Sequence, residues 1–324
     1  MKVLVTDMRH GSIQEERAIL EPAGLTIETA FCRTEEQLIR HGREAFAFLV
    51  SFAPITRRVL ESLPELKLIV RYGVGVDNVD VAAARQLGKL VARVPDYCID
   101  EVAAHTLSLI LAGLRMLCPL SRAAKDGRWV KDPSVEKLRR PASVAAGIVG
   151  LGRVGSRVAE CLRPLVARIL SYDPYVSAAA AGSSQVGGVG WESVASLSEL
   201  FHRCQIVSLH APLNEQTHDL IDTRVLTAAR DLILVNTSRA DLINRQALES
   251  AMEEGRISFF GADVFWQEPP DYSDPRTVEF LKRRNVLITP HMAWYSEESE
   301  REVRRKAAEA VLRYLRGEQL LHTV

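Results

Sequence analysis

The feature that most constrains how this chain can fold is a loop of three glycines directly after an apolar run. Gly150, Gly152 and Gly155 stand in the spacing GxGxxG within GIVGLGRVGSRVA. The apolar run VAAGIVG (144–150) precedes the loop, and helix-like sequence follows it. A strand–turn–helix unit that binds a dinucleotide requires this order. Gly150 permits the tight turn, Gly152 lets the backbone approach a pyrophosphate, and Gly155 lets the helix pack close to the strand.

An acidic residue stands where this motif needs one. Asp173, in SYDPY, ends the next strand-like run and lies 18 residues beyond Gly155. A carboxylate there can bind the ribose hydroxyls, and it disfavours the additional phosphate of NADP. A glycine-rich turn without nucleotide is the alternative, and the acid and its context disfavour it. Since free N–H groups at a helix start favour phosphate, we expect NAD(H), bound by Gly150, Gly152, Arg153, Val154, Gly155 and Asp173.

Strand-like runs alternate with helix-like segments along most of the chain. Short, β-branched, apolar runs come first, at 2–7, 25–30, 47–51 and 67–73. A second series lies at 144–150, 167–173, 204–211, 232–238, 259–265 and 285–290. The alternation predicts an α/β fold. We expect two units, Rossmann-like or flavodoxin-like, each with a parallel sheet covered by helices, and a cleft between them.

Two further segments complete this division of the chain. The apolar stretch 98–129 predicts one long helix or two. The charged amphipathic segment 296–318 predicts a last helix that starts at an N-cap, Ser296, and returns to the first unit. A polar connection, KDPSVEKLRRPAS, leads into the second series. We place the first unit at 1–98 plus 293–324 and the second at 99–292.

Composition excludes several classes of protein. The 324 residues suggest about two domains. The 41 basic and 41 acidic residues give no basic excess for nucleic acid or an anionic membrane. Five scattered cysteines without a CxxC indicate reduced thiols in a cytoplasmic protein, with no disulfide framework and no metal site. The start MKVLVTD is strand-like rather than a signal peptide, and no apolar run reaches the roughly 18 residues of a membrane span.

Three ionisable residues follow strands of the second unit. Arg239 comes after LILVNTS, Glu268 after GADVFWQ, and His291 after NVLITP. Ligands of open α/β sheets bind beyond the carboxyl ends of the strands. Arginine suits the carboxylate and carbonyl of a 2-keto acid. A histidine can donate the proton that a carbonyl needs when it receives a hydride, and a neighbouring carboxylate favours its protonated form and fixes its tautomer. Taken singly, the three could be a surface charge, a loop acid and a packed histidine.

A second glycine pair lies in the first unit. Gly73, Val74 and Gly75 follow the run KLIVR, without a third glycine or a suitably spaced acid. They are therefore not a second dinucleotide site. Backbone N–H groups exposed at a strand end can bind a carboxylate. A plain turn is the alternative for this segment.

These residues resemble a known family, the D-isomer-specific 2-hydroxyacid dehydrogenases. The resemblance runs over nearly the whole chain through RYGVGVDNVD, VPDYCIDEVAAHTLSLIL, GIVGLGRVGSRVA, VSLHAPLNEQTHDLI, LVNTSRADLINRQAL, GADVFWQEP and TPHMAWYSEES. Details such as GLGRVG, YDPY and HMAWYSEES look closest to the branch of the C-terminal binding protein corepressors and their bacterial relatives. The resemblance implies a substrate-binding first unit, an NAD-binding second unit, and a homodimer built mainly through 98–129. It also implies that the first unit closes over the second.

The resemblance also implies roles for individual residues. His291 corresponds to the general acid/base, Glu268 to its partner, and Arg239 to the substrate-binding arginine. Further correspondences concern the cofactor: Asp263 holds the nicotinamide carboxamide, Thr237 lies in the turn facing the nicotinamide, His210 begins the loop under the cofactor, and Thr106 lies near the phosphates. The remaining ones concern the substrate: the amides of Val74 and Gly75 hold its carboxylate, and Arg71 and Trp294 lie near it.

The sequence departs from the family pattern after the arginine. A glycine is usual at position 240, where this chain has alanine, and Ala240 fits only if that position has no positive φ. Asp241 is close enough in sequence to pair with Arg239 and weaken its hold on substrate. Ala104 replaces an acid. These changes concern catalytic efficiency rather than cofactor binding.

The loop SFAPIT bears on the substrate. It offers Phe52 and no cation, although Arg57 and Arg58 follow it. Together with Trp294, Phe52 favours a small or apolar 2-keto acid over a phosphorylated one. We expect an NAD-dependent dehydrogenase that forms a D-2-hydroxy acid. A dimeric, NAD(H)-responsive binding protein with little or no dehydrogenase activity is the alternative, and a dehydrogenase of another oxidised acid, such as a phosphonate, also remains open.

Overall fold

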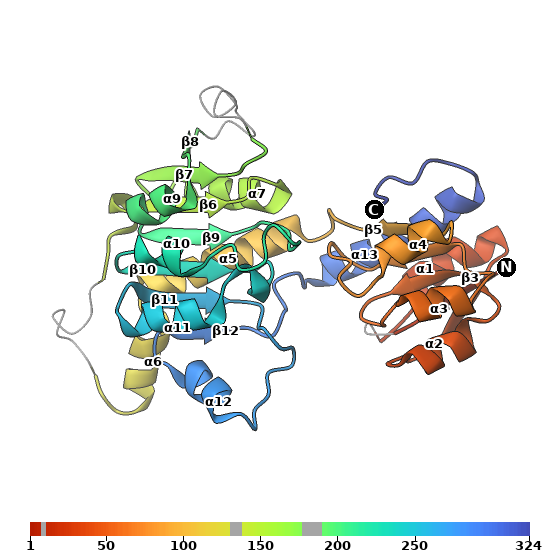
Figure 1. Cartoon of the computed structure of the whole chain (residues 1–324), viewed down its shortest axis with the longest axis horizontal. Coiled ribbons are helices and arrows are strands. Elements are labelled where there is room, and N and C mark those ends of the chain that lie inside the picture. Colours follow the sequence, from red (N-terminus) through yellow and green to blue (C-terminus); the bar gives the residue numbers. More distant parts are fainter. Residues whose placement is uncertain (8–10, 130–137, 177–189) are drawn as a thin grey trace. The chain divides into compact units, whose positions relative to one another are not determined.

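The computed structural model describes residues 1–7, 11–129, 138–176 and 190–324. The polar connection predicted at 131–143 lies mostly outside these residues. The chain divides into two compact units, Met1–Cys98 with Tyr295–Val324, and Ile99–Trp294. Each unit holds a parallel sheet flanked by helices (Figure 1), which confirms the predicted α/β fold class.

The sheet of the first unit has five parallel strands in the order β2-β1-β3-β4-β5. The central strand β3 is buried along its whole length because its sequence, AFAFLV, is apolar throughout. The last strand, β5, lies outside the predicted runs. The strands are β1 (Lys2–Val5), β2 (Thr26–Thr29), β3 (Ala45–Val50), β4 (Leu68–Arg71) and β5 (Leu90–Arg93).

Side-chain caps define where the helices of this unit begin. The Thr34 side chain accepts a hydrogen bond from the Gln37 N–H, and Asp80 accepts one from Ala83. Ser296 and Ser299 cap the last helix reciprocally, so Ser296 is the N-cap that the sequence predicts. The helices are α1 (Gln14–Leu20), α2 (Glu35–Gly42), α3 (Arg57–Ser62), α4 (Val81–Gln86) and α13 (Glu297–Leu315), and a short 3-10 helix, η1, covers Glu21–Ala23.

A buried ion pair fastens α13 to the first unit. The guanidinium of Arg304 donates to both carboxylate oxygens of Glu16 on α1, at 3.0 Å and 2.8 Å. The Tyr72 hydroxyl donates to the same carboxylate at 2.8 Å. Glu16 is 1% exposed and Arg304 is 5% exposed. These two buried charges compensate each other, because either one alone would remain in the interior without an opposite charge.

The sheet of the second unit has seven parallel strands in the order β12-β11-β10-β9-β6-β7-β8. The order reverses between β9 and β6, which is the switch point where open α/β sheets bind ligands. The strands are β6 (Ala145–Val149), β7 (Arg168–Tyr172), β8 (Glu192–Ser193), β9 (Ile206–Leu209), β10 (Leu232–Asn236), β11 (Ile257–Ala262) and β12 (Val286–Ile288).

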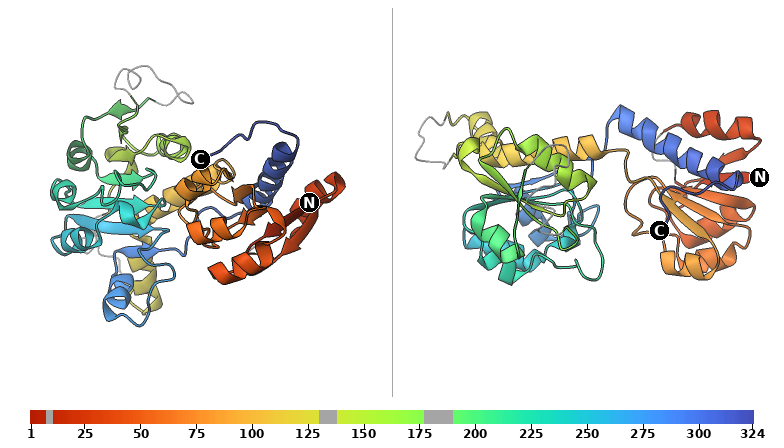
Figure 2. Two further views of the ribbon diagram at one scale, coloured as in Figure 1. Left: turned by 45° about the vertical axis from the view of Figure 1, so that its right-hand side comes forward. Right: turned by 90° about the horizontal axis from the view of Figure 1, so that it is seen from above.

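Helices cover both faces of this sheet (Figure 2). On one face α5 and α7 enclose a core that includes Ile148 and Phe259. On the other face α9, α10, α11 and α12 enclose a core that includes Phe201 and Phe260. The helices are α5 (Ile99–Leu114), α6 (Leu117–Lys125), α7 (Arg153–Leu162), α9 (Leu197–Arg203), α10 (Thr223–Thr227), α11 (Arg245–Glu253) and α12 (Pro275–Lys282), with 3-10 turns η2 (Pro141–Ser143) and η3 (Ala240–Leu242).

The long apolar segment forms two helices rather than one. Met116 takes a left-handed conformation between α5 and α6, and the two helix axes differ by 63°. A Cβ on Gly113 would stand 2.5 Å from the Phe259 ring, so α5 packs very close to β11. None of the described helices is by itself long and apolar enough to cross a membrane, although the bent pair α5–α6 meets both conditions when taken together.

Candidate active site

The glycine loop of the second unit has the form that a dinucleotide requires. Gly150 has a φ of 89°, and a Cβ there would meet the backbone of His210 at 2.9 Å. A Cβ on Gly155 would stand 2.0 Å from the Gly150 carbonyl oxygen. Gly152 differs, because a Cβ there would meet no atom within 4 Å and its φ is an ordinary −68°. No protein atom near position 152 therefore requires a glycine there. The open space is available to a bound group.

Asp173 lies beside this loop. One of its carboxylate oxygens accepts the Leu151 N–H at 2.8 Å, and the other accepts the Tyr175 N–H at 2.9 Å. A carboxylate offers about four acceptor positions, so two hydrogen bonds leave capacity for the hydroxyls of a ribose. The helix α7 begins immediately after Gly152 with Arg153 and Val154.

His291 and Glu268 are in direct contact. The Nδ1 atom of His291 lies 2.6 Å from Oε2 of Glu268, and both side chains are a little over one-third exposed (37% and 38%). Because a carboxylate only accepts, Nδ1 carries the proton of this hydrogen bond, which leaves Nε2 for a ligand. The second Glu268 oxygen accepts the Phe265 N–H at 3.0 Å. The carboxylate therefore has a fixed orientation toward the imidazole.

Glu268 is held in its ionised form. Partial burial acts to raise the pKa of its carboxyl, but the hydrogen bond and charge of His291, the Phe265 N–H and the Arg239 guanidinium together bring that pKa below its ordinary value. Arg239 is thus near enough to act on Glu268. Its Nη1 donates to the Ser238 carbonyl at 2.8 Å. Ala240, the unusual residue after this arginine, lies in η3 and is absent from the positive-φ residues of the described chain, so the condition for its tolerance is met.

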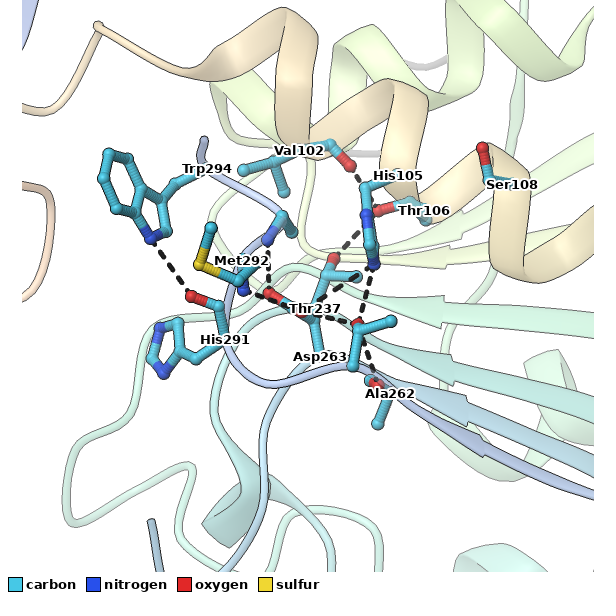
Figure 3. A network of polar contacts seen from close by, with 12 residues as sticks. Val102, His105, Thr106, Ser108, Thr237, Ala262, Asp263, His291, Met292 and Trp294 are labelled. Carbon is cyan, nitrogen blue, oxygen red and sulfur yellow. Dashed lines mark hydrogen bonds and ion pairs between the residues drawn. The ribbon is translucent and has the colours of Figure 1, made fainter. Parts of the chain in front are cut away.

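The backbone of His291 is in an unusual conformation. Its φ is 56°, in the left-handed region that a residue with a Cβ rarely adopts. Figure 3 shows the hydrogen bond from Trp294 to the carbonyl group of His291. The Trp294 indole N–H donates to the His291 carbonyl at 3.0 Å, and the His291 N–H donates to the Thr289 carbonyl at 3.0 Å. The conformation is therefore fixed by contacts on both sides of the residue.

Asp263 contacts the same segment (Figure 3). Its Oδ1 accepts the Met292 N–H at 2.9 Å, and its Oδ2 accepts the Ala293 N–H at 2.7 Å. The Thr289 hydroxyl adds a third hydrogen bond to Oδ1 at 2.5 Å. Asp263 is 1% exposed. The family resemblance implies that this acid holds the nicotinamide carboxamide. In the structure three hydrogen bonds from the protein use its oxygens, and about one of its four acceptor positions is left for a ligand.

Threonine and histidine residues of α5 complete this network. Thr106 donates to the Val102 carbonyl at 2.7 Å and lies 2.8 Å from the Thr237 hydroxyl (Figure 3). The His105 Nε2 lies 2.8 Å from the Thr289 hydroxyl. Sequence reasoning missed His105 and Thr289. The signal available in the sequence for His105 was its position directly before Thr106. No rule of spacing relates a residue near the start of α5 to the ends of β10–β12, so this signal could not be used.

His210 lies in the turn after β9, under the glycine loop. Its Nε2 is 2.7 Å from the Ser208 hydroxyl, and its Nδ1 is covered and lacks a hydrogen-bond partner among the described residues. The residue keeps some exposed surface, but the ring is enclosed, and burial lowers the pKa of His210 to about 3. The imidazole is therefore neutral at physiological pH.

The predicted substrate residues of the first unit lie in two loops and at the end of β4. Phe52, which is 55% exposed, belongs to a loop whose N–H groups at Ser51, Phe52 and Ala53 all donate to Asp7. In the other loop, Gly73 has a φ of 142° that favours glycine, and Val74 is 40% exposed. The Arg71 guanidinium donates to the Tyr72 carbonyl at 2.7 Å, within this second loop. Gly75 follows Val74 directly.

Metal ligands do not cluster anywhere in the described parts of the chain. No group of three or more histidine, cysteine, aspartate or glutamate side chains there is arranged to hold a metal ion. The five cysteines are free thiols.

The chain is similar to known proteins in both sequence and structure. The model of the family "D-isomer specific 2-hydroxyacid dehydrogenase, NAD binding domain" matches residues 107–293. The glyoxylate reductase of Korarchaeum cryptofilum is 34% identical over 268 residues, which are 82% of this chain and 78% of that protein. The D-3-phosphoglycerate dehydrogenase of Methanocaldococcus jannaschii is 34% identical over 320 residues, which are 98% of this chain and 58% of that protein.

A solved structure matches the whole fold. The D-lactate dehydrogenase of Aquifex aeolicus, complexed with NAD and lactic acid, superposes with a TM-score of 0.86 at 26% identity, over 98% of this chain and 96% of that chain. This chain therefore belongs to the family of D-isomer-specific 2-hydroxyacid dehydrogenases, as its motifs predict. The family's NAD-binding domain confirms the predicted NAD(H) cofactor. The chain spans 58% of the length of the M. jannaschii relative. The resemblance to the corepressor branch stays a prediction.

Proposed function

We propose that this chain is an NAD(H)-dependent oxidoreductase that interconverts a 2-keto acid and a D-2-hydroxy acid. The observation that carries the proposal is the 2.6 Å contact between His291 and Glu268, with Arg239 close enough to lower the pKa of that carboxyl. All three follow strands of a domain whose family binds NAD. A packed, purely structural histidine would not need a partly exposed ring with one nitrogen left for a ligand.

The geometry of the pair supports a proton-transfer role. The bound cofactor supplies or accepts the hydride at the carbonyl carbon. Glu268 accepts the Nδ1–H of His291 and so fixes the tautomer and the ring orientation. In reduction, the Nε2–H of His291 donates its proton to the carbonyl oxygen; in oxidation, the neutral Nε2 accepts the hydroxyl proton. Arg239 binds the carboxylate and polarises the carbonyl through its forked N–H groups.

The cofactor residues that we propose surround the glycine loop. The N–H groups of Arg153 and Val154 at the start of α7 hold the pyrophosphate, and Asp173 binds the ribose hydroxyls. The open space at Gly152 supports this placement. We further propose that Thr106 lies near the phosphates, that Thr237 faces the nicotinamide, and that the loop begun by His210 lies beneath the cofactor.

The substrate that we propose is small or apolar. In the first unit, the amides of Val74 and Gly75 and the side chains of Arg71 and Phe52 bind it, with Trp294 supplying an apolar surface. Arg58 supports the absence of a phosphate site, because it already pairs with Glu35 at 2.8 Å and Glu36 at 2.7 Å. The relatives named above act on glyoxylate, phosphoglycerate or lactate by their names, and the shared class is a small 2-hydroxy or 2-keto acid.

We propose a homodimer in the cytoplasm, built through α5 and α6. Two exposed apolar side chains support this assembly, Leu117 on α6 (53% exposed) and Trp129 just beyond it (77%). Contact with a second copy of the chain would remove these two side chains from water.

The test is NADH oxidation with a panel of 2-keto acids: glyoxylate, hydroxypyruvate, pyruvate, and branched and aromatic members. We expect at least one to be reduced, and chiral chromatography of the product to give the D isomer. 3-Phosphohydroxypyruvate serves as the phosphorylated comparison and should be a poorer substrate. Tight NADH binding without turnover on any acid would contradict the proposal and favour the dimeric binding protein.

A further inference from the structure

Four aromatic side chains pack together where the chain leaves β11 toward Glu268. The rings of Phe265 and Trp266 meet edge to face with their centroids 5.4 Å apart, and Phe280 of α12 meets Trp266 in the same way at 5.9 Å. Phe260 of β11 lies 6.4 Å from Trp266 in a stacked arrangement. Such pairs stabilise a cluster beyond the area that they bury. The Trp266 ring is therefore held by three neighbouring rings.

The guanidinium of Arg245 attaches this cluster to α11. Its Cζ atom is 5.5 Å from the ring centroids of Phe265 and Trp266, and 5.8 Å from that of Phe280. Its Nε donates to Glu249, one turn further along α11, at 2.8 Å. A planar cation is attracted to aromatic rings at these distances. Because Arg245 is the first residue of α11, the cluster is fixed to the start of that helix.

The Trp266 indole joins the same cluster to the segment that carries Arg239. Its N–H donates to the Ile243 carbonyl at 3.0 Å. Ile243 ends η3, the 3-10 turn that starts directly after Arg239, and its own N–H donates to the Ala240 carbonyl at 2.9 Å. The indole has this one donor and no acceptor. The ring that packs in the cluster thus also sets the distance between the cluster and η3.

Glu268 is tied to the other side of this loop. The Phe265 N–H donates to Oε1 of Glu268 at 3.0 Å, while Oε2 lies 2.6 Å from Nδ1 of His291. A single residue separates Trp266 from Glu268, and two residues span at most about 7 Å. The place of the indole therefore limits where the Glu268 carboxylate can lie. Packing and hydrogen bonds connect the Arg239 segment to His291 through this loop.

We propose that Trp266 is a positioning residue, which holds the Arg239 segment and the Glu268 loop at a fixed separation through its hydrogen bond to Ile243 and its packing with Arg245. This inference rests on the proposed function for its catalytic meaning, since one substrate must face both Arg239 and Glu268. Its structural part concerns only the attachment of the loop 265–268 to η3 and α11. A tryptophan that merely filled the core would need its ring but not its N–H.

The decisive variant is Trp266→Phe. It keeps an aromatic ring in the cluster and removes the indole N–H, so the Ile243 carbonyl loses its donor. Trp191→Phe is the matched control. Trp191 is 8% exposed in the core beneath α5 and α7, and its indole N–H has no hydrogen-bond partner among the described residues. The two changes remove the same atoms from a packed ring, but only the first one removes a hydrogen bond.

Hydrogen–deuterium exchange tests the attachment without requiring turnover. The Phe265 N–H is the reporter, because it is bonded to Glu268 within the loop. We expect Trp266→Phe to speed its exchange by roughly fivefold to tenfold, the equivalent of one hydrogen bond, and Trp191→Phe to leave it unchanged. Unchanged exchange in Trp266→Phe would overturn the proposal. If that variant fails to fold by circular dichroism, Arg245→Lys keeps the charge without the planar contact and must also speed exchange at this amide.

Kinetics with the best 2-keto acid test the consequence for the reaction. We expect Trp266→Phe to raise KM, because Arg239 is less well placed, and to lower kcat, because Glu268 is. Together these changes reduce kcat/KM by roughly tenfold to a hundredfold, while the dissociation constant of NADH stays unchanged. A fall in kcat alone, in proportion to a loss of folded protein, would show that Trp266 only stabilises the fold and would overturn the proposal.

The two measurements separate this inference from the proposed function. If the wild-type protein reduces no keto acid, the proposed function fails. The exchange at Phe265 still decides whether the Trp266 indole attaches the loop.

Discussion

At the scale of single residues, the described chain keeps one carboxylate of the candidate site ionised and one histidine neutral. Glu268 is ionised and faces His291, because hydrogen bonds and positive charges outweigh its partial burial. His210 is the opposite case, because nothing charged offsets its enclosure and the ring stays neutral. A neutral ring beneath the glycine loop adds no positive charge where we propose that a nicotinamide cofactor binds.

The enclosure of His210 has a consequence for stability. Burial lowers the pKa of His210 from 6.5 to about 3 in the folded protein, whereas the unfolded chain takes up this proton near pH 6.5. Between these values the unfolded state binds roughly one proton more, so the free energy of unfolding falls as the pH falls below 6.5. We expect His210→Gln to reduce the pH dependence of the free energy of unfolding by the equivalent of about one proton. Urea unfolding from pH 7 to pH 4 measures this dependence. His202→Gln, at an exposed position of α9, is the control, and a wild-type slope in His210→Gln would contradict the assignment.

The sequence predicts a candidate site at one edge of a sheet, for a physical reason. His291, Glu268 and Arg239 follow strands of one parallel sheet, and the carboxyl ends of such strands share an edge. The spacing could not predict what Asp263 contacts. Its partners are backbone N–H groups 29 and 30 residues away along the chain, and the residue before them, His291, takes a positive φ. Nothing in the letters of TPHMAWYS indicates that conformation.

At the scale of elements, periodicity predicted most strands and missed β5 and the two-residue strand β8. The run LVAR of β5 is short, and its first residue, Leu90, is exposed, so the pattern is weak. The break between α5 and α6 was left open by the sequence, since both parts are apolar and helix-like. The structure places it at Met116, in a left-handed conformation without a glycine to mark it.

Each unit has a buried aspartate that organises a loop after a strand. Asp7, just beyond β1, is 8% exposed and accepts the N–H groups of Ser51, Phe52 and Ala53. This arrangement is the counterpart, in the first unit, of the contacts that Asp263 makes with Met292 and Ala293. It positions the loop that carries Phe52, which we propose contacts the substrate.

The contacts of Asp7 predict that its replacement by asparagine lowers the stability of the protein. Asp7→Asn replaces an acceptor by a donor opposite a backbone N–H, so we expect the free energy of unfolding to fall by about 2 kcal/mol. Asp80→Asn, which changes the N-cap of α4, is the control and should shift it by no more than a few tenths. Denaturant unfolding of both variants gives the comparison. Equal, small losses would show that Asp7 is not the support of this loop.

At the scale of the whole molecule, the chain passes between its two units twice, after Cys98 and after Trp294. The second passage begins three residues beyond His291 and leads into α13, which Ser296 caps and the buried pair of Glu16 and Arg304 fastens. The alternation of strand-like and helix-like segments predicted two α/β units. The buried ion pair could not be predicted, because its members stand 288 residues apart without a pattern to join them.

The central claim is that His291, supported by Glu268, transfers the proton in a reaction driven by NAD(H). The most direct test is turnover of the best 2-keto acid by His291→Ala, beside NADH affinity measured by fluorescence titration. We predict that kcat falls by about 10²–10⁴-fold while the dissociation constant of NADH stays at its wild-type value. Wild-type turnover by His291→Ala would contradict the account.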